Sequence, residues 1–273
     1  MVTAAARGLV VGVAVVLAAA GVAGCGGGGG GADTGGKAKA AASHSAPAET
    51  PMAVPADVRP LTQAQLEQAV VGAKDVPGWH TGSVTGRSGD GVQSPVNVRN
   101  VKALPAVSPA ACAPLYYTTL TLARQQHGAV VEQMVMPVAD KDPRALMMSL
   151  KSYAPADAAQ LMADLRTALR TCTSFASPEP GQSWGSPKRL ADPKLGDEAL
   201  SYHLVQTVPS VDDKGDEDGG APVHGRFHFV VVRSGATVAV YYVTGADDDP
   251  GFPEVPMAVV TAQTAKLAKA AAR

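Results

Sequence analysis

The chain has 273 residues, and 23 Lys and Arg balance 24 Asp and Glu to a formal net charge of −1, so nothing favours general attraction to nucleic acid. Apolar residues make up 46% of the chain, enough for a core, while aromatic residues make up only 4%. The length fits one large domain or two small ones. The wealth of Ala, Gly, Val and Pro indicates a GC-rich genome, and we expect an actinobacterial source.

Residues 1–24 are typical of a lipoprotein signal peptide. Arg7 is a charged start, and residues 8–20 form an apolar stretch, shorter than the roughly 20 residues of a spanning helix. The sequence VAGC at 22–25 follows directly, and small residues before a cysteine predict cleavage there and transfer of a lipid to Cys25. We expect a palmitate-bearing lipoprotein at the extracytoplasmic face of the cell membrane. An ordinary signal peptide with an unrelated cysteine, or an uncleaved anchor helix, would be the alternative.

Residues 25–58 predict a tether between this lipid and a folded domain at 59–273. A run of glycine is followed by Gly, Ala, Ser, Thr and Pro, which cannot bury enough surface to offset the entropy of ordering. As a Gly-rich coil this segment would span roughly 30 Å.

The remaining cysteines, Cys112 and Cys172, would lie in an oxidising compartment and allow a single pairing. A bridge closing a loop of about 60 residues would contribute about 4 kcal/mol in the loop-entropy model. Two free thiols, redox-active or metal-binding, are the alternative.

The first half of the domain predicts short helices and strands. Thr62 and Gln65 form a capping box, with Leu61 and Leu66 at the staple positions, and the apolar face of this helix runs to Ala73. Strands are expected near 79–85 and 96–102, and a short second helix, disturbed by a proline, starts at 108–109 and carries one cysteine of the pair.

The middle of the domain predicts strands at 129–137 and 145–153, although a helix would also accept the second segment. Pro155 starts a long helix whose apolar positions follow the i, i+3, i+4 rule up to Cys172. A bridge to Cys112 would therefore join two helices against a common sheet.

The last third predicts an antiparallel meander of strands 199–208, 225–233 and 236–243, and a final helix from Pro256. Ser234-Gly235 reads as a two-residue hairpin turn. It would pair Val231 with Val238, Phe229 with Val240, and Phe227 with Tyr242. The fold class is therefore α+β, a single domain with one disulfide in which an antiparallel sheet packs against helices.

Five stretches form a further pattern: DVPGW at 75–79, PAAC at 109–112, SY at 152–153, LGDEA at 195–199 and a valine-rich hairpin at 230–243. Together they resemble the PknH-type extracellular sensor domain of actinobacteria, which occurs on receptor-like kinases and as stand-alone lipoproteins. The resemblance implies an antiparallel sheet with helices beside a cleft, and the binding of a ligand. The kinase-attached domain has two disulfides, whereas this chain has cysteines for one, and the family supplies no site residues to carry over.

Two motifs suggest chemistry but lack its setting. GQSWG at 181–185 matches the G-x-S-x-G nucleophile elbow, but prolines flank it where a strand and a helix are needed, so we expect a loop with Trp184 packed on the domain and a dispensable Ser183. The acidic run at 212–219 has Lys214 where an EF-hand loop needs an oxygen ligand. It predicts a solvated loop, as does the Asp triplet at 247–249.

A polar sheet face, whose residues have little reason to be buried, is the candidate ligand site, with a solvated face that binds no partner as the alternative. His203, Arg226, His228 and Tyr241, with Thr237 beside them, would lie opposite the apolar face, and Arg226 would supply charge for a polar or anionic ligand. A zinc site would need His203, a second histidine and a further carboxylate, and we expect no metal and no cofactor.

The predicted function is a non-enzymatic, sensor-like domain that binds a ligand or partner. Its partners would be the membrane, through the lipid on Cys25, and an unknown ligand or envelope protein. An assembly lipoprotein without a small ligand, a hydrolase using Ser183, and lipid or metal carriage are the alternatives.

Overall fold

The computed structural model describes residues 49–83, 106–119, 127–138, 145–177, 181–212, 215–245 and 251–272. The leader, Cys25, the strand expected at 96–102 and the Asp triplet at 247–249 lie outside these residues. Within them, no helix is long and apolar enough to cross a membrane.

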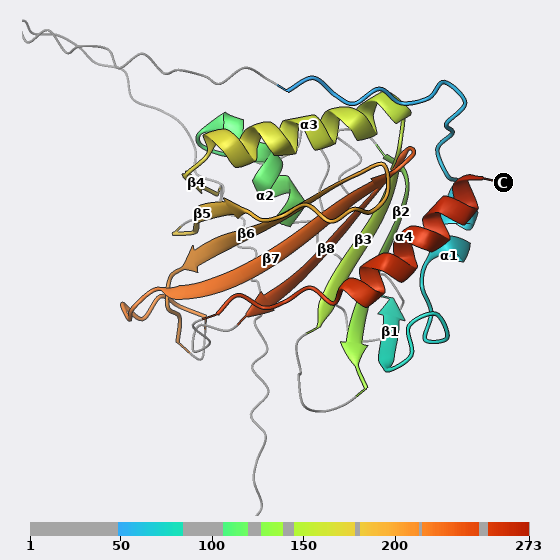
Figure 1. The fold of residues 1–273 in the computed structure, drawn as a ribbon. Coiled ribbons are helices and arrows are strands. Elements are labelled where there is room, and N and C mark those ends of the chain that lie inside the picture. The colour runs from blue at the N-terminus through green and yellow to red at the C-terminus, as the bar shows by residue number, and fades with distance from the viewer. Residues whose placement is uncertain are drawn as a thin grey trace, which may run out of the picture.

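Eight strands form one antiparallel sheet in the order β1-β2-β3-β8-β7-β6-β5-β4 (Figure 1). The predicted strands at 129–137, 145–153 and 199–208 are present as β2, β3 and β6. The last strand, β8, lies between β3 and β7, so it joins the early strands to the late ones. The strand bounds are β1 (Trp79–Ser83), β2 (His127–Pro137), β3 (Leu146–Tyr153), β4 (Ser174–Ala176), β5 (Ser183–Arg189), β6 (Glu198–Val208), β7 (Val223–Ser234) and β8 (Thr237–Gly245).

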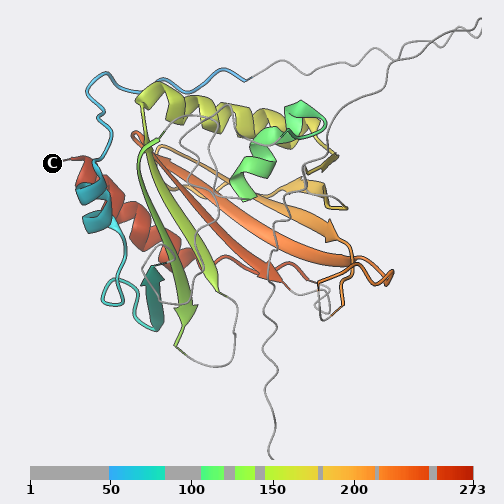
Figure 2. The same cartoon turned by 180° about the vertical axis from the view of Figure 1, so that it is seen from behind.

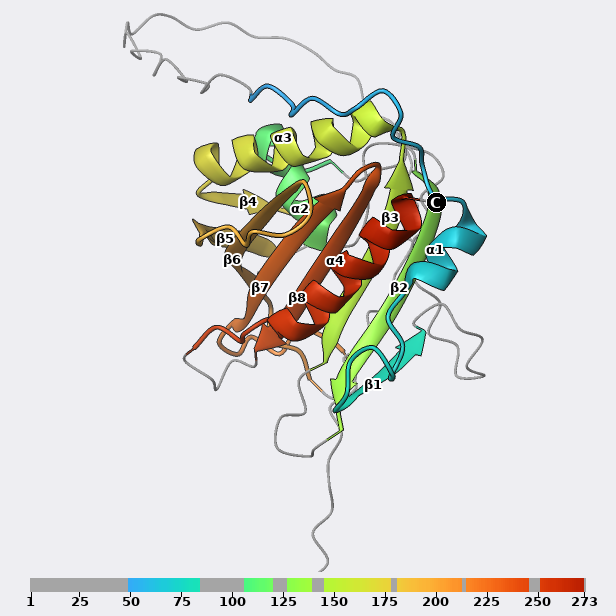
Figure 3. The same ribbon diagram turned by 45° about the vertical axis from the view of Figure 1, so that its right-hand side comes forward.

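Helices cover both faces of the sheet (Figures 2 and 3). The face covered by η2 (Ala110–Cys112), α2 (Ala113–Thr119) and α3 (Pro155–Thr171) is called the α3 face. The face covered by α1 (Gln63–Ala69) and α4 (Met257–Ala271) is called the α4 face. This arrangement confirms the α+β class. Because both faces are covered, β7 is apolar on both sides, with Phe229 and Val231 toward α3 and Val230 and Val232 toward α4.

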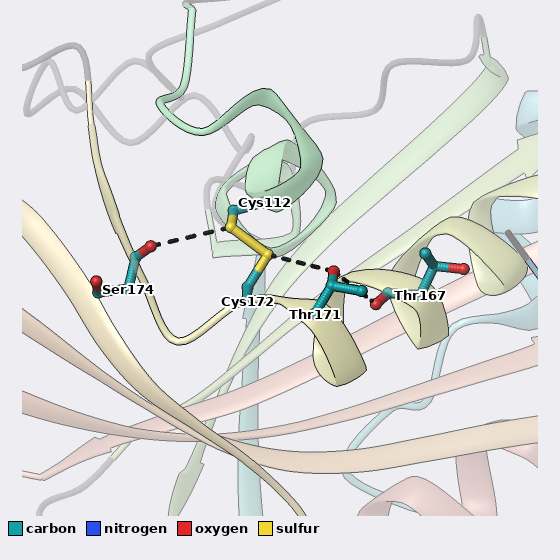
Figure 4. Close-up of a disulfide and its surroundings, with 5 residues drawn as sticks. All are labelled: Cys112, Thr167, Thr171, Cys172 and Ser174. Atoms are coloured by element: carbon teal, nitrogen blue, oxygen red, sulfur yellow. Dashed lines mark hydrogen bonds between the residues drawn. A yellow bond between two sulfur atoms is a disulfide. The ribbon is translucent and has the colours of Figure 1, made fainter. Parts of the chain in front are cut away.

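The predicted disulfide is confirmed. Cys112 in η2 and Cys172 at the end of α3 are bonded, with their Cα atoms 5.7 Å apart (Figure 4). The Cys172 N–H donates to the carbonyl of Ala168 and completes the last turn of α3. The bridge therefore joins the two helical segments of the α3 face, as expected from the apolar stripe that ends at Cys172.

The first helix has the predicted capping box, in which the Gln65 N–H donates to Thr62 Oγ1. It ends at Ala69, however, and not near Ala73. The buried side chain of Gln263, on α4, takes over the backbone groups there: its Nε2 donates to Ala69 O at 2.8 Å and its Oε1 accepts from Val71 N at 2.8 Å. A distant side chain therefore satisfies backbone groups that a further turn would have used.

The β7–β8 hairpin forms, but the predicted pairing was wrong by two residues. Val231 pairs with Val240 and Phe229 with Tyr242, because the turn residues are Gly235 and Ala236. Gly235 has φ +59°, the conformation that a type II′ turn requires at its first turn position. The shift is even, so every side chain keeps its predicted face.

The segment expected to be a loop around Ser183 is strand β5. Its proline, Pro187, lies where the register with β6 shifts, next to Ser186 with φ +53°. A bulge tolerates a residue that cannot donate a ladder hydrogen bond. Trp184 packs on the domain as predicted, stacked on Phe175 at 6.3 Å and tilted against Phe227 at 5.2 Å.

Candidate functional site

The sequence-predicted polar face is not an open surface. Tyr241 is 0% exposed and Thr237 only 2%, because α4 packs across this part of the α4 face. Burial raises the pKa of the Tyr241 hydroxyl above its usual range. The expectation that these two residues would have little reason to be buried was therefore wrong. The apolar stripe of α4 predicted a packed helix but not which sheet face it would cover.

The two histidines of this face do lie together. The His203 ring meets the His228 ring edge to face at 4.9 Å and stacks on Phe252 at 3.9 Å. Desolvation, with contributions from His228 and Lys188, lowers the pKa of His203 to about 4. His203 is therefore neutral at physiological pH and packs as an aromatic ring.

His228 holds the segment that leads into α4. Its Nε2 lies 3.0 Å from Ser201 Oγ, and its Nδ1 lies 3.1 Å from the carbonyl oxygen of Pro253 and 3.4 Å from Val255 N. Burial lowers its pKa. These contacts give His228 a structural role. Arg226, on the same strand, is partly exposed and is paired in register with Val205 and Gly245.

The catalytic and metal candidates are not assembled in the described residues. Ser183 faces Thr207 in register, and Thr207 Oγ1 lies 3.0 Å from Nδ1 of His224 on the next strand. Two strand spacings, about 10 Å, therefore separate Ser183 from that histidine. Asp212 and Asp218 accept hydrogen bonds from N–H groups of their own loop, and no group of three metal ligands occurs in the described part of the chain.

A second set of polar side chains lies among apolar ones on the α3 face, where β2, β3 and β8 run side by side. Three rows of side chains cross these strands in register, and we call them the Lys151 strip. No β2 side chain belongs to the hydrophobic cluster beneath α2 and α3, so the strip extends beyond that core. The rows are Val130–Lys151–Val238, Glu132–Ser149–Val240 and Met134–Met147–Tyr242.

The strip has a buried polar centre and a half-buried margin. Lys151 and Ser149 are 4% and 0% exposed, whereas Glu132, Met147 and Tyr242 are partly exposed. The buried Oγ of Ser149 has no hydrogen-bond partner in the described part of the chain. The strip therefore contains a buried hydroxyl that has no partner among the described residues, next to a cation, with a tyrosine and two methionines at its margin.

Lys151 has the strongest electrostatic perturbation in the strip. Burial lowers the pKa of its ammonium to about 8, and the charge of Glu132, one residue pair along the same face, raises it in part. Glu132 is thus the described residue whose charge favours the ammonium. Burial also raises the pKa of Tyr242 to about 12, helped by Glu132. A cation is thus held in a poorly solvated position where the charge of Glu132 offsets only part of the cost of burial.

The Lys151 strip was not among the candidates predicted from the sequence, although one signal for it was present. In β3, Leu146, Met148 and Leu150 alternate along one face, and Lys151 lies on the other. A lysine among buried residues of a strand is unusual because its charge must be compensated. The position became informative once β8 was found on the other side of β3.

No protein-family model matches the chain, and no curated protein matches it. Among solved structures, the extracellular domain of PknH from Mycobacterium tuberculosis matches with a TM-score of 0.39 and 10% identity, over 77% of this chain and 96% of that one. An uncharacterized protein of Mycobacterium smegmatis, the Rv0999 ortholog, matches with a TM-score of 0.33 and 13% identity, over 80% and 97%. The first is the domain type that the sequence motifs resemble. At these identities and TM-scores, neither likeness carries a conclusion about ligand or activity.

Proposed function

We propose that this chain is an envelope lipoprotein, anchored by a lipid on Cys25, whose folded part binds a ligand without catalysing a reaction. The leader and the cysteine that follows it support the anchor. The disulfide supports an oxidising compartment. The binding role is supported by the Lys151 strip, which replaces the polar α4 face as the candidate site.

The observation that carries the binding role is the buried ammonium of Lys151. A side chain chosen only for packing at this central strand position would be apolar, as are Val130 and Val238 on either side of it. A buried charge without partners destabilises a fold, and such groups concentrate at functional sites. A bound ligand that accepts a hydrogen bond would supply the partner that Ser149 lacks among the described residues, and it would add to the charge that Glu132 offers Lys151.

The margin of the strip indicates what else the ligand would carry. Met134 and Met147 are flexible and polarisable and adapt to irregular apolar shapes. Tyr242 adds an aromatic ring, and Glu132 adds a hydrogen-bond acceptor. We therefore propose a polar ligand with an acceptor group at Lys151 and an apolar portion over the methionines.

The test is a thermal-shift screen of the chain from residue 49 onward against envelope metabolites and glycan fragments. It would be run in parallel on the wild type, on Lys151→Met, and on Lys194→Met as a control at an exposed lysine. A ligand of the strip should raise the Tm of the wild type and the control and lose its effect on Lys151→Met. Compounds that shift all three proteins equally would remove the strip as the binding site.

A further inference from the structure

The end of the tether lies on the folded domain. Residues 49–58 run along α3, from its C-terminal half past its N-terminal end, before the chain reaches α1 (Figures 1 and 3). Residues 51–56 and the first turns of α3 line a shallow groove, and Met52 is 46% exposed. Apolar packing of this segment is therefore loose.

One polar residue, Glu49, holds this segment at its far end. Its carboxylate pairs with Arg166, at 3.5 Å, and with Arg170, one helical turn further along α3. Its backbone N–H donates to Thr167 Oγ1 at 3.1 Å. Three side chains of one face of α3 thus contact a single residue of the tether.

Further ion pairs of the domain hold Arg166 in position to bind this carboxylate. Arg166 also pairs with Glu198, and Glu198 pairs in turn with Arg233, which reaches Asp197 at 3.1 Å. Glu198 is 9% exposed and Arg233 only 1%. The ion pairs thus join three arginines to two carboxylates of the domain, those of Asp197 and Glu198. Glu49 of the tether supplies the third carboxylate. The buried pairs hold Arg166 in place, so that it meets the tether without being free to turn away.

We propose that Arg166, Thr167 and Arg170 form a carboxylate-binding site that latches the tether to α3 through Glu49. The latch fixes the point at which the chain leaves the domain. Roughly two dozen residues then separate Glu49 from Cys25, and as a Gly-rich coil they would span about 25–30 Å, whereas a domain of this size is about 40 Å across. The latched protein therefore turns α3 toward the membrane. This orientation rests on the proposed lipid at Cys25, whereas the latch itself does not.

The latch can be tested on the full chain in detergent with an endoprotease that cleaves after glutamate. The bond between Glu49 and Thr50 is cut only when Glu49 leaves its arginines, so its cleavage rate reports the unlatched population. The bonds after Glu217 and Glu254, both exposed, serve as internal references. We expect Arg170→Gln to speed cleavage after Glu49 roughly two- to fivefold, the range for loss of a partly exposed ion pair.

The control is Lys74→Gln, which removes an exposed cation from the turn after α1, away from the latch on α3. It should leave cleavage after Glu49 unchanged, and added salt should speed that cleavage in the wild type more than in Arg170→Gln. An unchanged rate in Arg170→Gln would overturn the latch. Equal acceleration at all three bonds would also reject it, because that result indicates loosening of the whole fold. The assay does not depend on lipid or ligand, so its failure would leave the proposed function standing.

Discussion

Replacing Lys151 with methionine should make the protein more stable. Methionine has a similar length and flexibility and no charge, so it can fill the same space between Val130 and Val238. The wild-type ammonium has a pKa of about 8 in the fold against an ordinary value of 10.5, with burial as the main cause. That difference corresponds to about 3 kcal/mol of unfavourable interaction with the charged form.

The sign of the pH dependence follows from the lowered pKa. Between pH 8 and 10.5 the unfolded chain binds more protons at Lys151 than the native state does, so the free energy of unfolding rises with pH in this window. Above pH 10.5 Lys151 is neutral in both states and does not destabilise the native state. This stability is lost as the pH falls through 8, where the buried ammonium is charged. At pH 7 we expect Lys151→Met to be more stable by about 2 kcal/mol, because Glu132 also loses a favourable neighbour.

Urea unfolding of wild type, Lys151→Met and the Lys194→Met control at pH 7.0 and 9.5 would measure this. The advantage of Lys151→Met over the wild type should shrink by about 2 kcal/mol between these pH values. Measurements above pH 10 should be avoided. Burial raises the pKa of tyrosines such as Tyr202, so these residues destabilise the fold as the pH rises through 10. A Lys151→Met protein less stable than the wild type at pH 7 would refute the reasoning, since Lys151 would then be a stabilising residue.

Three further predictions concern the anchor, a long-range contact and a histidine. Cys25→Ser should leave an unprocessed precursor or release the protein from the membrane fraction, and normal retention with metabolic lipid labelling would contradict the anchor. Gln263→Met should lower the free energy of unfolding, measured in urea, by about 2–4 kcal/mol, because it leaves buried backbone groups of Ala69 and Val71 unpaired. The control Gln133→Met removes one hydrogen bond together with an oxygen that has no partner among the described residues, so it should cost about 1 kcal/mol or less. His203 has a lowered pKa, so it should destabilise the fold as the pH falls from 6.5 to about 4; His203→Phe should flatten that part of the pH–stability curve, and an effect equal to that of His224→Gln would rule out this source.

Much of the fold could be predicted because its causes are local. The apolar spacing of α3 ends at the cysteine that forms the bridge, and Met162, Leu165 and Ala168 of that stripe are buried. The capping box at Thr62 depends on residues within one turn. Alternation along β7 and β8 gave the right faces even though the pairing was wrong by two residues. The exact pairing of β7 with β8 depends on whether Gly235 is the first or the second residue of the turn. Its positive φ places it first.

The remaining features depend on contacts between distant residues. The end of α1 is set by Gln263, 192 residues after Val71. The burial of Tyr241 depends on which face α4 covers. The Lys151 strip exists because β8 lies beside β3. The segment 145–153 taken alone does not show that the face carrying Lys151 would lie next to partly exposed side chains of β2 and β8. The site candidates on β6, β7 and β8 were therefore predicted less reliably than the strands themselves, because their exposure depends on α4.

The central position of β8 also orders the events of biogenesis. In a chain that emerges from its N-terminus, β2 and β3 can pair as soon as both are made, and Cys112 and Cys172 are both available well before residue 237. Until β8 arrives, β3 keeps one edge of unpaired backbone groups, which is a template for pairing with other chains. The early half of the molecule is thus exposed to aggregation until its last strand is made, and truncation before residue 237 should yield an aggregating species and not a smaller folded domain.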